Sequence, residues 1–336
     1  MKSRSPMIVE VTRGQIIESS HQVIAVIMDE RGLISGYWGN TDFVTIPRSC
    51  IKMLQAIPFV ESGAMEKFGL DDKMLALACS SHQGEKAHIL LAQQWMEKLK
   101  ITEAALHCGP AMPSHAGTAA EMIKKGFHPT PTIHNCSGKH LGIISTCLAL
   151  GENPAGYGKM DHPAQVRIRK YLSEVMKIQM DKMPFGVDGC GIPTYAVPLH
   201  HIATGMNHLM QQHAVQARRI TVQRIVEACK RHPHLLSGTD DFVTAVNEKS
   251  NGRAILKNGA EGVYAGLIPD KGYSFALKVL DGHWRAAEVA AGFILRYFGG
   301  LTDKEYVELK QYTMPDVKNS RGERVGEIRI QKVTNA

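Results

Sequence analysis

The chain has 336 residues, of which 44% are hydrophobic and 21% are charged. These proportions are typical of globular proteins and exclude a disordered chain, a collagen-like repeat and a coiled coil. The length allows one large domain or two of medium size, and either buries a substantial core. The formal net charge is +7, but the basic residues are scattered rather than gathered into the dense stripe that nucleic acid usually requires. We therefore expect no nucleic-acid partner.

The cysteines indicate the compartment. Seven of them are widely spaced, an odd number in a chain large enough to fold without disulfides, which favours a reducing compartment and hence the cytoplasm. The amino-terminal residues lack the apolar core and cleavage site of a secretory signal. The longest apolar stretch, around residues 141–150, is shorter than the roughly 20 residues of a membrane-spanning helix, so we expect no membrane association.

The first forty residues have a β pattern. Strands are predicted at residues 8–12, 21–28 and 33–38, with a polar turn at 29–32. From Pro47 the apolar spacing becomes helical, and helices dominate to about residue 235, with examples at 86–100 and 164–177. Segments rich in glycine and proline interrupt this region at 108–117, 128–138 and 184–198. Such loops are where functional sites tend to be built.

β character returns after Phe242. Strands are predicted at 254–257, 262–268 and 273–280, followed by a helix at 284–298. Strands at both ends with helices between them predict one antiparallel sheet assembled from both termini. We therefore expect a β-rich lobe at about 1–46 plus 240–336 and a helical lobe at about 47–239, acting as a single catalytic unit over residues 1–336.

Ser49 and Lys52 lie three residues apart at the start of a predicted helix, and therefore on one face. A neutral lysine can deprotonate a serine, and N–H groups at a helix start can stabilise an oxyanion. The spacing alone is weak, because a chain of this composition contains about one such pair by chance. Lys257-Asn258-Gly259 lies on a strand near the other end. This layout resembles the penicillin-recognising serine hydrolases, although Asn258 replaces their usual hydroxyl residue.

Three further segments concentrate polar groups. Ser81 and His82 precede a helix that Glu85 begins, so this segment is either a helix cap or an active-site edge that moves a proton or holds a substrate amide. Residues 134–140 and 187–193 are rich in polar residues and glycine. Their thiols, Cys136 and Cys190, could bind zinc, but a gap of 54 residues between them matches no standard zinc spacing. The residues alone leave metal binding open.

Five motifs in order give the chain a specific resemblance. It resembles the Rhizobium etli-type L-asparaginases over most of its length, through Arg48-Ser49-x-x-Lys52 with Met53-x-Gln55-Ala56, Ala76-Leu77-Ala78-Cys79-x-Ser81-His82-x-Gly84-Glu85, His134-Asn135-Cys136-Ser137-Gly138-Lys139-His140, Val187-Asp188-Gly189-Cys190-x-x-Pro193-Thr194 and Gly259-Ala260-Glu261-Gly262.

This resemblance implies an α/β fold of the α+β type, like that of glutaminases and serine β-lactamases, in a homodimer. The implied reaction is hydrolysis of L-asparagine to L-aspartate and ammonia through a covalent β-aspartyl-enzyme. Two serine–lysine pairs are implied, Ser49 with Lys52 and Ser81 with Lys257. The position of Lys257 depends on the spacing between this lysine and the Gly259-Ala260-Glu261-Gly262 segment. Arg48, His82 and His140 are the residues expected to contact or orient the substrate.

The resemblance also implies a zinc site. Its ligands are expected at Cys136, Lys139 and Cys190, with Asp188 outside the ligand set or joined through a water. A lysine ligates metal only as the neutral amine, so the metal-bound Lys139 needs a strongly lowered pKa. Two thiolates nearly neutralise the ion, so we expect it to position substrate or support the site rather than activate water.

Two alternatives stay open. A serine amidohydrolase acting on glutamine or on a D-amino-acid peptide shares the same layout, and only substrate screening separates it from an asparaginase. A zinc-stabilised binding protein with a disused cleft, or a weak RNA binder using the high pI, is the alternative of another class.

Overall fold

A computed structural model describes residues 5–210 and 216–331. These residues form two compact units. The first contains the described residues of Met1–Cys50, Ala196–His213 and Ala245–Ala336, and the second those of Ile51–Tyr195 and Ala214–Thr244. Each is described by itself.

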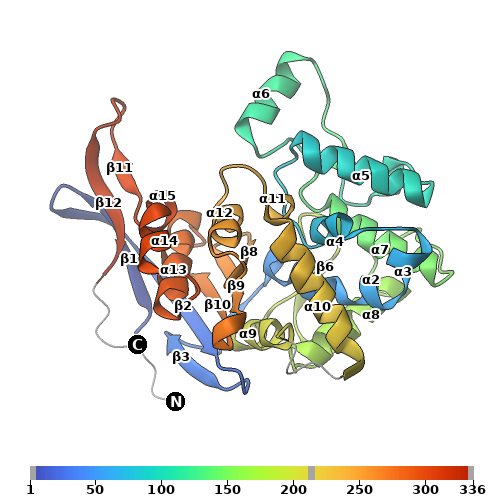
Figure 1. The fold of residues 1–336 in the computed structure, drawn as a ribbon, viewed down its shortest axis with the longest axis horizontal. Coiled ribbons are helices and arrows are strands. Elements are labelled where there is room, and N and C mark those ends of the chain that lie inside the picture. Colours follow the sequence, from blue (N-terminus) through green and yellow to red (C-terminus); the bar gives the residue numbers. More distant parts are fainter. Residues whose placement is uncertain (1–4, 211–215, 332–336) are drawn as a thin grey trace. The chain divides into compact units, whose positions relative to one another are not determined.

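The first unit is built on an antiparallel eight-stranded sheet whose strands come from both ends of the chain (Figure 1, blue and orange to red). The order is β11-β12-β1-β2-β10-β9-β8, with β3 paired to β2. The bounds are β1 Met7–Arg13, β2 Ile16–Met28, β3 Ile34–Trp38, β8 Ile255–Gly259, β9 Val263–Ile268, β10 Tyr273–Val279, β11 Asp316–Lys318 and β12 Arg324–Ile330. A small pair joins β4 (Val44–Thr45) to β7 (Val197–Pro198).

Helices cover both faces of this sheet. Ser274 Oγ donates to Ala203 O on α9 (Leu199–His208) at 3.0 Å. On the opposite face, Trp38 contacts Phe293 of α13 (Trp284–Tyr297), with ring centroids 6.1 Å apart. Residues 23–28 of β2 are all buried, which explains why that stretch is a continuous apolar run rather than an alternating one. The unit's other helical elements are η6 Pro269–Lys271, α14 Asp303–Glu308 and α15 Lys310–Thr313, and α12 (Phe242–Lys249) spans the point where the second unit ends.

The second unit is mainly helical. The buried helix α7 (Ser137–Ala149) contacts α3, α4 and α5, and Trp95 Nε1 of α5 donates to Ser145 Oγ of α7 at 3.0 Å. The helices are α1 Lys52–Gln55, α2 Ile57–Glu61, α3 Ala64–Lys67, α4 Asp72–Ala78, α5 Lys86–Leu99, α6 Ala116–Lys124, α8 Pro163–Val175, α10 Gln216–Arg231 and α11 Pro233–Leu236. Short elements are η2 Glu103–Ala105, η3 Pro131–Ile133, η4 Met180–Lys182 and the hairpin β5 Phe185–Val187 with β6 Pro193–Tyr195.

The predicted α/β class, with an antiparallel sheet made from both ends of the chain and helices between, is confirmed. The predicted lobes were divided at about residues 47 and 240, whereas the first unit also contains the described residues of 47–50 and 196–213, and the second unit extends to Thr244. The expected helix after Pro47 is divided into η1 (Arg48–Ile51), α1, α2 and α3. Pro58 lies in the first turn of α2, and Gly63 takes a positive φ of 71° before α3, so neither residue continues a long helix. None of the described helices is long and apolar enough to cross a membrane.

Candidate active site

The first unit carries Ser49 and Lys257. Ser49 lies on η1, directly after Arg48, whose φ of 53° is positive, a strained conformation for a residue with a side chain and one that concentrates at functional sites. Lys257 on β8 is fully buried, and its Nζ donates to Asn258 Oδ1 at 2.7 Å and Asn258 O at 2.9 Å. A Cβ on Gly259 would lie 2.7 Å from Pro47 O. This glycine therefore lets β8 lie directly against the segment that leads into Ser49.

The second unit carries Lys52 and Ser81. Lys52 begins α1, is 1% exposed, and its Nζ contacts Ser80 O, Ser81 Oγ at 3.2 Å and Asn135 O at 3.4 Å. A neutral amine has two N–H groups and one lone pair. When the two carbonyls receive the N–H groups, the lone pair is left for the Ser81 hydroxyl. The sequence paired Lys52 with Ser49 and did not predict this contact with Ser81.

The segment that carries Ser81 is fixed by residues 234–239 of the same unit. Ser81 N–H donates to Leu236 O at 2.8 Å. The Glu85 carboxylate receives the Thr239 N–H and the Thr239 hydroxyl, each at 2.7 Å. Burial opposes ionisation of Glu85, but these bonds and the nearby His234 outweigh it and lower its pKa. The charged carboxylate thus holds the loop that positions Ser81.

His82 is buried, with both ring nitrogens bonded inside the protein. Its Nδ1 accepts the Gly84 N–H at 3.1 Å, and its Nε2 lies 2.9 Å from Ser137 Oγ, the first residue of α7. Burial, together with neighbouring His88 and Lys52, lowers its pKa well below the usual value. The neutral ring therefore ties the Ser81 loop to α7, and the substrate contact of His82 stays a prediction.

Two thiols and an amine meet at the start of α7. Lys139 Nζ donates to Cys190 Sγ at 3.0 Å, and Cys190 Sγ lies 3.3 Å from Asp188 Oδ2. A hydrogen bond from Cys190 lowers the pKa of Cys136 well below that of a free thiol and raises that of Cys190. Burial disfavours the Lys139 ammonium, but the two sulfurs outweigh burial and raise its pKa. The metal-free cluster is thus a Cys136 thiolate beside a charged lysine.

The cluster fits zinc by its chemistry. No group of three or more His, Cys, Asp or Glu side chains in residues 5–210 and 216–331 is arranged to hold a metal, so an ion here needs the Lys139 amine as its third ligand. Two sulfurs and a nitrogen are ligands that zinc accepts. The raised pKa of Lys139 is the reverse of what a metal-bound amine needs, so zinc would have to displace the lysine proton.

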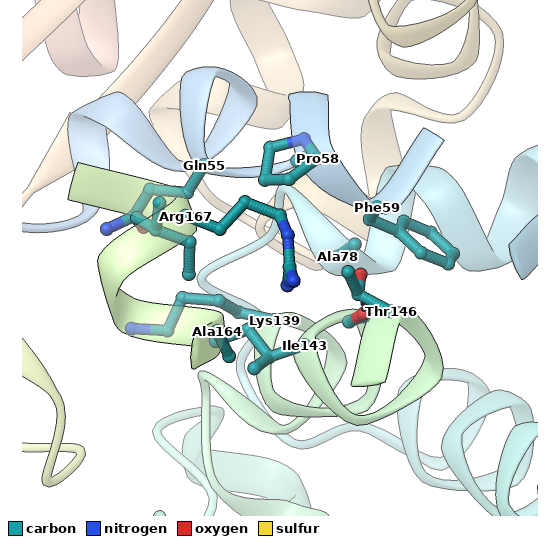
Figure 2. A pocket seen from close by; sticks show the side chains of 12 residues that line it. Gln55, Pro58, Phe59, Ala78, Lys139, Ile143, Thr146, Ala164 and Arg167 are labelled. Atoms are coloured by element: carbon teal, nitrogen blue, oxygen red, sulfur yellow. Dashed lines mark hydrogen bonds between the residues drawn. The ribbon is translucent and has the colours of Figure 1, made fainter. Parts of the chain in front are cut away.

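A small cavity in the second unit is lined by Lys139 and Arg167, among other residues. Figure 2 shows the Arg167 guanidinium reaching into it, while the Lys139 amine turns away from Arg167. Arg167 pairs with Glu152, and its Nη1 has no partner among the described residues. The cavity volume is ≈ 10 Å³, enough for about one water molecule. It is too small for an amino-acid substrate.

The structure also adds residues that the sequence did not single out. Tyr157 lies in the loop between α7 and α8. Its hydroxyl oxygen is 2.6 Å from His140 Nδ1 and accepts the backbone N–H of His107 at 2.8 Å. His134 Nδ1 accepts the Cys136 N–H at 3.0 Å. A lone tyrosine in a loop has no sequence signal, whereas His134 lies inside a motif and was open to prediction.

The chain is similar to several known proteins. Among solved structures, the chain is similar to a β-lactamase from Mycobacterium bovis, with 12% identity, a TM-score of 0.43, and coverage of 82% of this chain and 94% of that one. It is similar to a putative β-lactamase from Bacteroides dorei (10%, 0.39, 83% and 86%) and to simvastatin synthase from Aspergillus terreus (12%, 0.37, 76% and 86%). No curated protein gives a match. The family model described as L-asparaginase II matches residues 9–330, and the chain belongs to the L-asparaginase II family.

Proposed function

We propose that this protein is an L-asparaginase of the Rhizobium etli type, which hydrolyses L-asparagine to L-aspartate and ammonia through a serine–lysine pair. The observation that carries the proposal is the buried Lys52 amine, held by two backbone carbonyls with its third contact to a serine hydroxyl. Family membership over residues 9–330 supports amidohydrolase chemistry. The choice of L-asparagine rests on the five motifs.

In the first half-reaction the Ser49 oxygen attacks the side-chain amide carbon of asparagine, and neutral Lys52 takes the serine proton. Backbone N–H groups near Ser49 stabilise the oxyanion. The C–N bond breaks as the leaving nitrogen receives a proton, and ammonia departs from a β-aspartyl ester on Ser49. In the second half-reaction water attacks the ester, gives its proton to the same base, and releases aspartate and free Ser49.

The second pair, Ser81 with Lys257, moves the proton. The Ser81 hydroxyl is within hydrogen-bonding distance of the Lys52 amine at 3.2 Å, so it passes the proton from Lys52 to the leaving nitrogen. The same contact makes Ser81 the competing candidate for the nucleophile. Arg48 and His140 bind or orient the substrate.

Cys136, Lys139 and Cys190 would hold zinc, with Asp188 outside the ligand set, and the bound ion would supply positive charge and orientation for the substrate. We also propose a homodimer in the cytoplasm. Glutamine is one methylene longer than asparagine, a difference that a simple pocket discriminates by about 1–3 kcal/mol. A related amidohydrolase acting on glutamine or a D-amino-acid peptide is therefore the comparison that the assay must include.

The test measures ammonia release from L-asparagine, L-glutamine and a D-amino-acid peptide side by side. Rapid release from asparagine alone is expected, and release from none of the three would overturn the proposed function. Ser49→Ala should lose about 10³-fold or more in kcat, with Ser173→Ala on α8 as the control serine. Mass spectrometry of the trapped acyl-enzyme identifies the nucleophile. An adduct on Ser81, with Ser49→Ala active, would reverse the roles of the two serines.

A further inference from the structure

A cavity of ≈ 380 Å³, the α5–α6 pocket, lies between helices α5 and α6 of the second unit. Its walls include Lys86 and Leu90 of α5, Met122 and Lys125 on or directly after α6, and Phe127 and Ile133 from the segment that follows. The volume is at the lower end of the range of about 300–1,000 Å³ for small-molecule sites. None of the proposed serine–lysine pairs lines the pocket, so it is not part of the candidate active site.

The walls of the pocket expose apolar surface. The Ala111–Thr130 bridge closes the base of the segment that carries α6 (Figure 1). Within α6 the buried residue is Met122. Phe127 after α6 is 64% exposed, and Leu90 on α5 is 46% exposed. An apolar ligand between these walls would remove their side chains from water, which is the main driving force for filling such a pocket.

The charged side chains of the walls favour a ligand with one negative charge. Lys125 Nζ pairs with Glu121 Oε1 at 2.5 Å. The pKa of Glu121 is lowered by its bond to Lys125 and, to a smaller extent, by the charge of Lys86. The Lys86 amine itself has no hydrogen bond or ion pair with a described residue. With His128 counted as neutral, two lysines and one glutamate give the walls a net charge of +1, which complements a monoanion and not a dianion.

We propose that the α5–α6 pocket binds a small amphipathic carboxylate. Its apolar part lies against Leu90, Met122 and Phe127, and its carboxylate pairs with the exposed Lys86 amine, where it keeps water on its other side. Asparagine does not fit this description, because its ammonium and amide groups would lose their water partners among apolar side chains. The site is therefore an addition to the proposed function and does not depend on it.

The first test measures ligand class by calorimetry of the full-length protein. Decanoate is the ligand used, with decanol and decyltrimethylammonium as its neutral and cationic counterparts, all below their micelle or solubility limits. We expect saturable binding of one decanoate per chain, binding of decanol that is about fivefold weaker through loss of one exposed ion pair, and no saturable binding of the cation. Absence of saturable decanoate binding, or equal affinities for decanoate and decanol, would overturn the proposal.

Matched variants test the two parts of the pocket. Phe127→Ala should weaken decanoate binding about tenfold, as expected for loss of an aromatic contact. Its control is Phe185→Ala, because Phe185 is 59% exposed in the same unit but lies outside the pocket. Lys86→Gln should weaken decanoate about fivefold and leave decanol unchanged, with Lys98→Gln on the same helix as the control lysine. If Phe127→Ala or Lys86→Gln binds decanoate as wild type does, the ligand lies elsewhere and the proposal is wrong.

Methyl NMR of the wild-type protein locates the ligand. With ¹³C-methyl methionine, decanoate should shift the signal of Met122, which lines the pocket. The signal of Met65, which is buried elsewhere in the second unit, should not move. Met122→Leu and Met65→Leu assign the two signals. An unmoved Met122 signal at saturating decanoate would overturn the proposal.

Sedimentation tests the other occupant that could cover these walls, a second copy of the chain. The mass in solution should be the same for wild type and Phe127→Ala, with or without decanoate. An assembly that dissociates when decanoate is added, or when Phe127 is replaced, would show that a second copy covers the pocket. That result would overturn the assignment of a small carboxylate.

Discussion

Gly138 lies where helix α7 comes closest to helix α4 in the second unit. It is the second residue of α7, and a Cβ built on it would lie 2.1 Å from Leu77 O and 2.5 Å from Leu77 C on α4. Both are backbone atoms, which cannot rotate away. Alanine at this position must push α7 from α4 by about 1 Å, since ordinary contacts begin at 3.4 Å. The change would move Lys139 on α7 away from the carboxyl end of α4, which leads into the segment that carries Ser81.

The magnitude can be set against a control on the same helix. Overpacking of a buried site costs about 1–3 kcal/mol, and a rigid backbone contact should place Gly138→Ala at the upper end. Gly142 lies one turn later, where a Cβ would be 3.5 Å from Ala78 Cβ and 3.6 Å from Phe59. That methyl fits, and alanine favours the helix by about 1 kcal/mol over glycine. We expect Gly142→Ala to be neutral or slightly stabilising.

The assay is urea unfolding of the three proteins, followed by circular dichroism and by residual ammonia release. Gly138→Ala should lower the free energy of unfolding by about 2–3 kcal/mol relative to wild type and should also lower activity under conditions where it is fully folded. Equal stability of Gly138→Ala and Gly142→Ala would refute the close approach of α7 to α4. Normal activity in folded Gly138→Ala would refute the claim that this approach positions the site.

Two further predictions concern protons. Because the folded-state pKa of Glu85 is lowered by its bonds to Thr239, its stabilisation is present above the unfolded value near 4.3 and is lost as pH falls through the folded value. Urea midpoints between pH 5 and 3 should therefore fall less steeply for Glu85→Gln than for wild type, and parallel slopes would contradict this. Zinc uptake by the metal-free protein should release about two protons, from Lys139 and Cys190, and weaken as pH falls. Calorimetry in buffers of different ionisation enthalpy counts them, and zero release would contradict the charged Lys139.

The sequence predicted the elements with strong local patterns. The continuous apolar run ending at Met28 and the strand ending at Val279 pair directly in the sheet. The helix after Trp284 was predicted to within a residue. These elements have long periodic stretches, whose burial follows from the pattern itself. The helical spacing after Pro47 was predicted correctly as helical, but the pattern did not show that the segment is divided into η1, α1 and α2.

The site residues were found in a different way. Cys136 and Cys190 are far apart in the sequence and match no metal spacing, so only the family resemblance predicted that they meet. In the structure their side chains are joined by a hydrogen bond. The carbonyls of Ser80 and Asn135 that hold Lys52 belong to the backbone, which has no sequence signature. Tyr157 was missed for the related reason that its partner is distant and its own loop has no pattern.

The hydrogen bonds of the second unit are compatible with the base role that we propose for Lys52. In the second unit, the buried His82 and His140 have pKa values well below the usual one, chiefly because of burial, so both rings are neutral. The hydrogen bond from Cys190 lowers the pKa of Cys136 well below that of a free thiol, and the nearby Lys139 lowers it further. The Lys52 amine, by contrast, contacts only neutral acceptors in the bonds described for it. In the proposed mechanism, a neutral Lys52 amine that donates its two N–H groups to carbonyls directs its lone pair at the Ser81 hydroxyl, which is the geometry that a proton transfer between them requires.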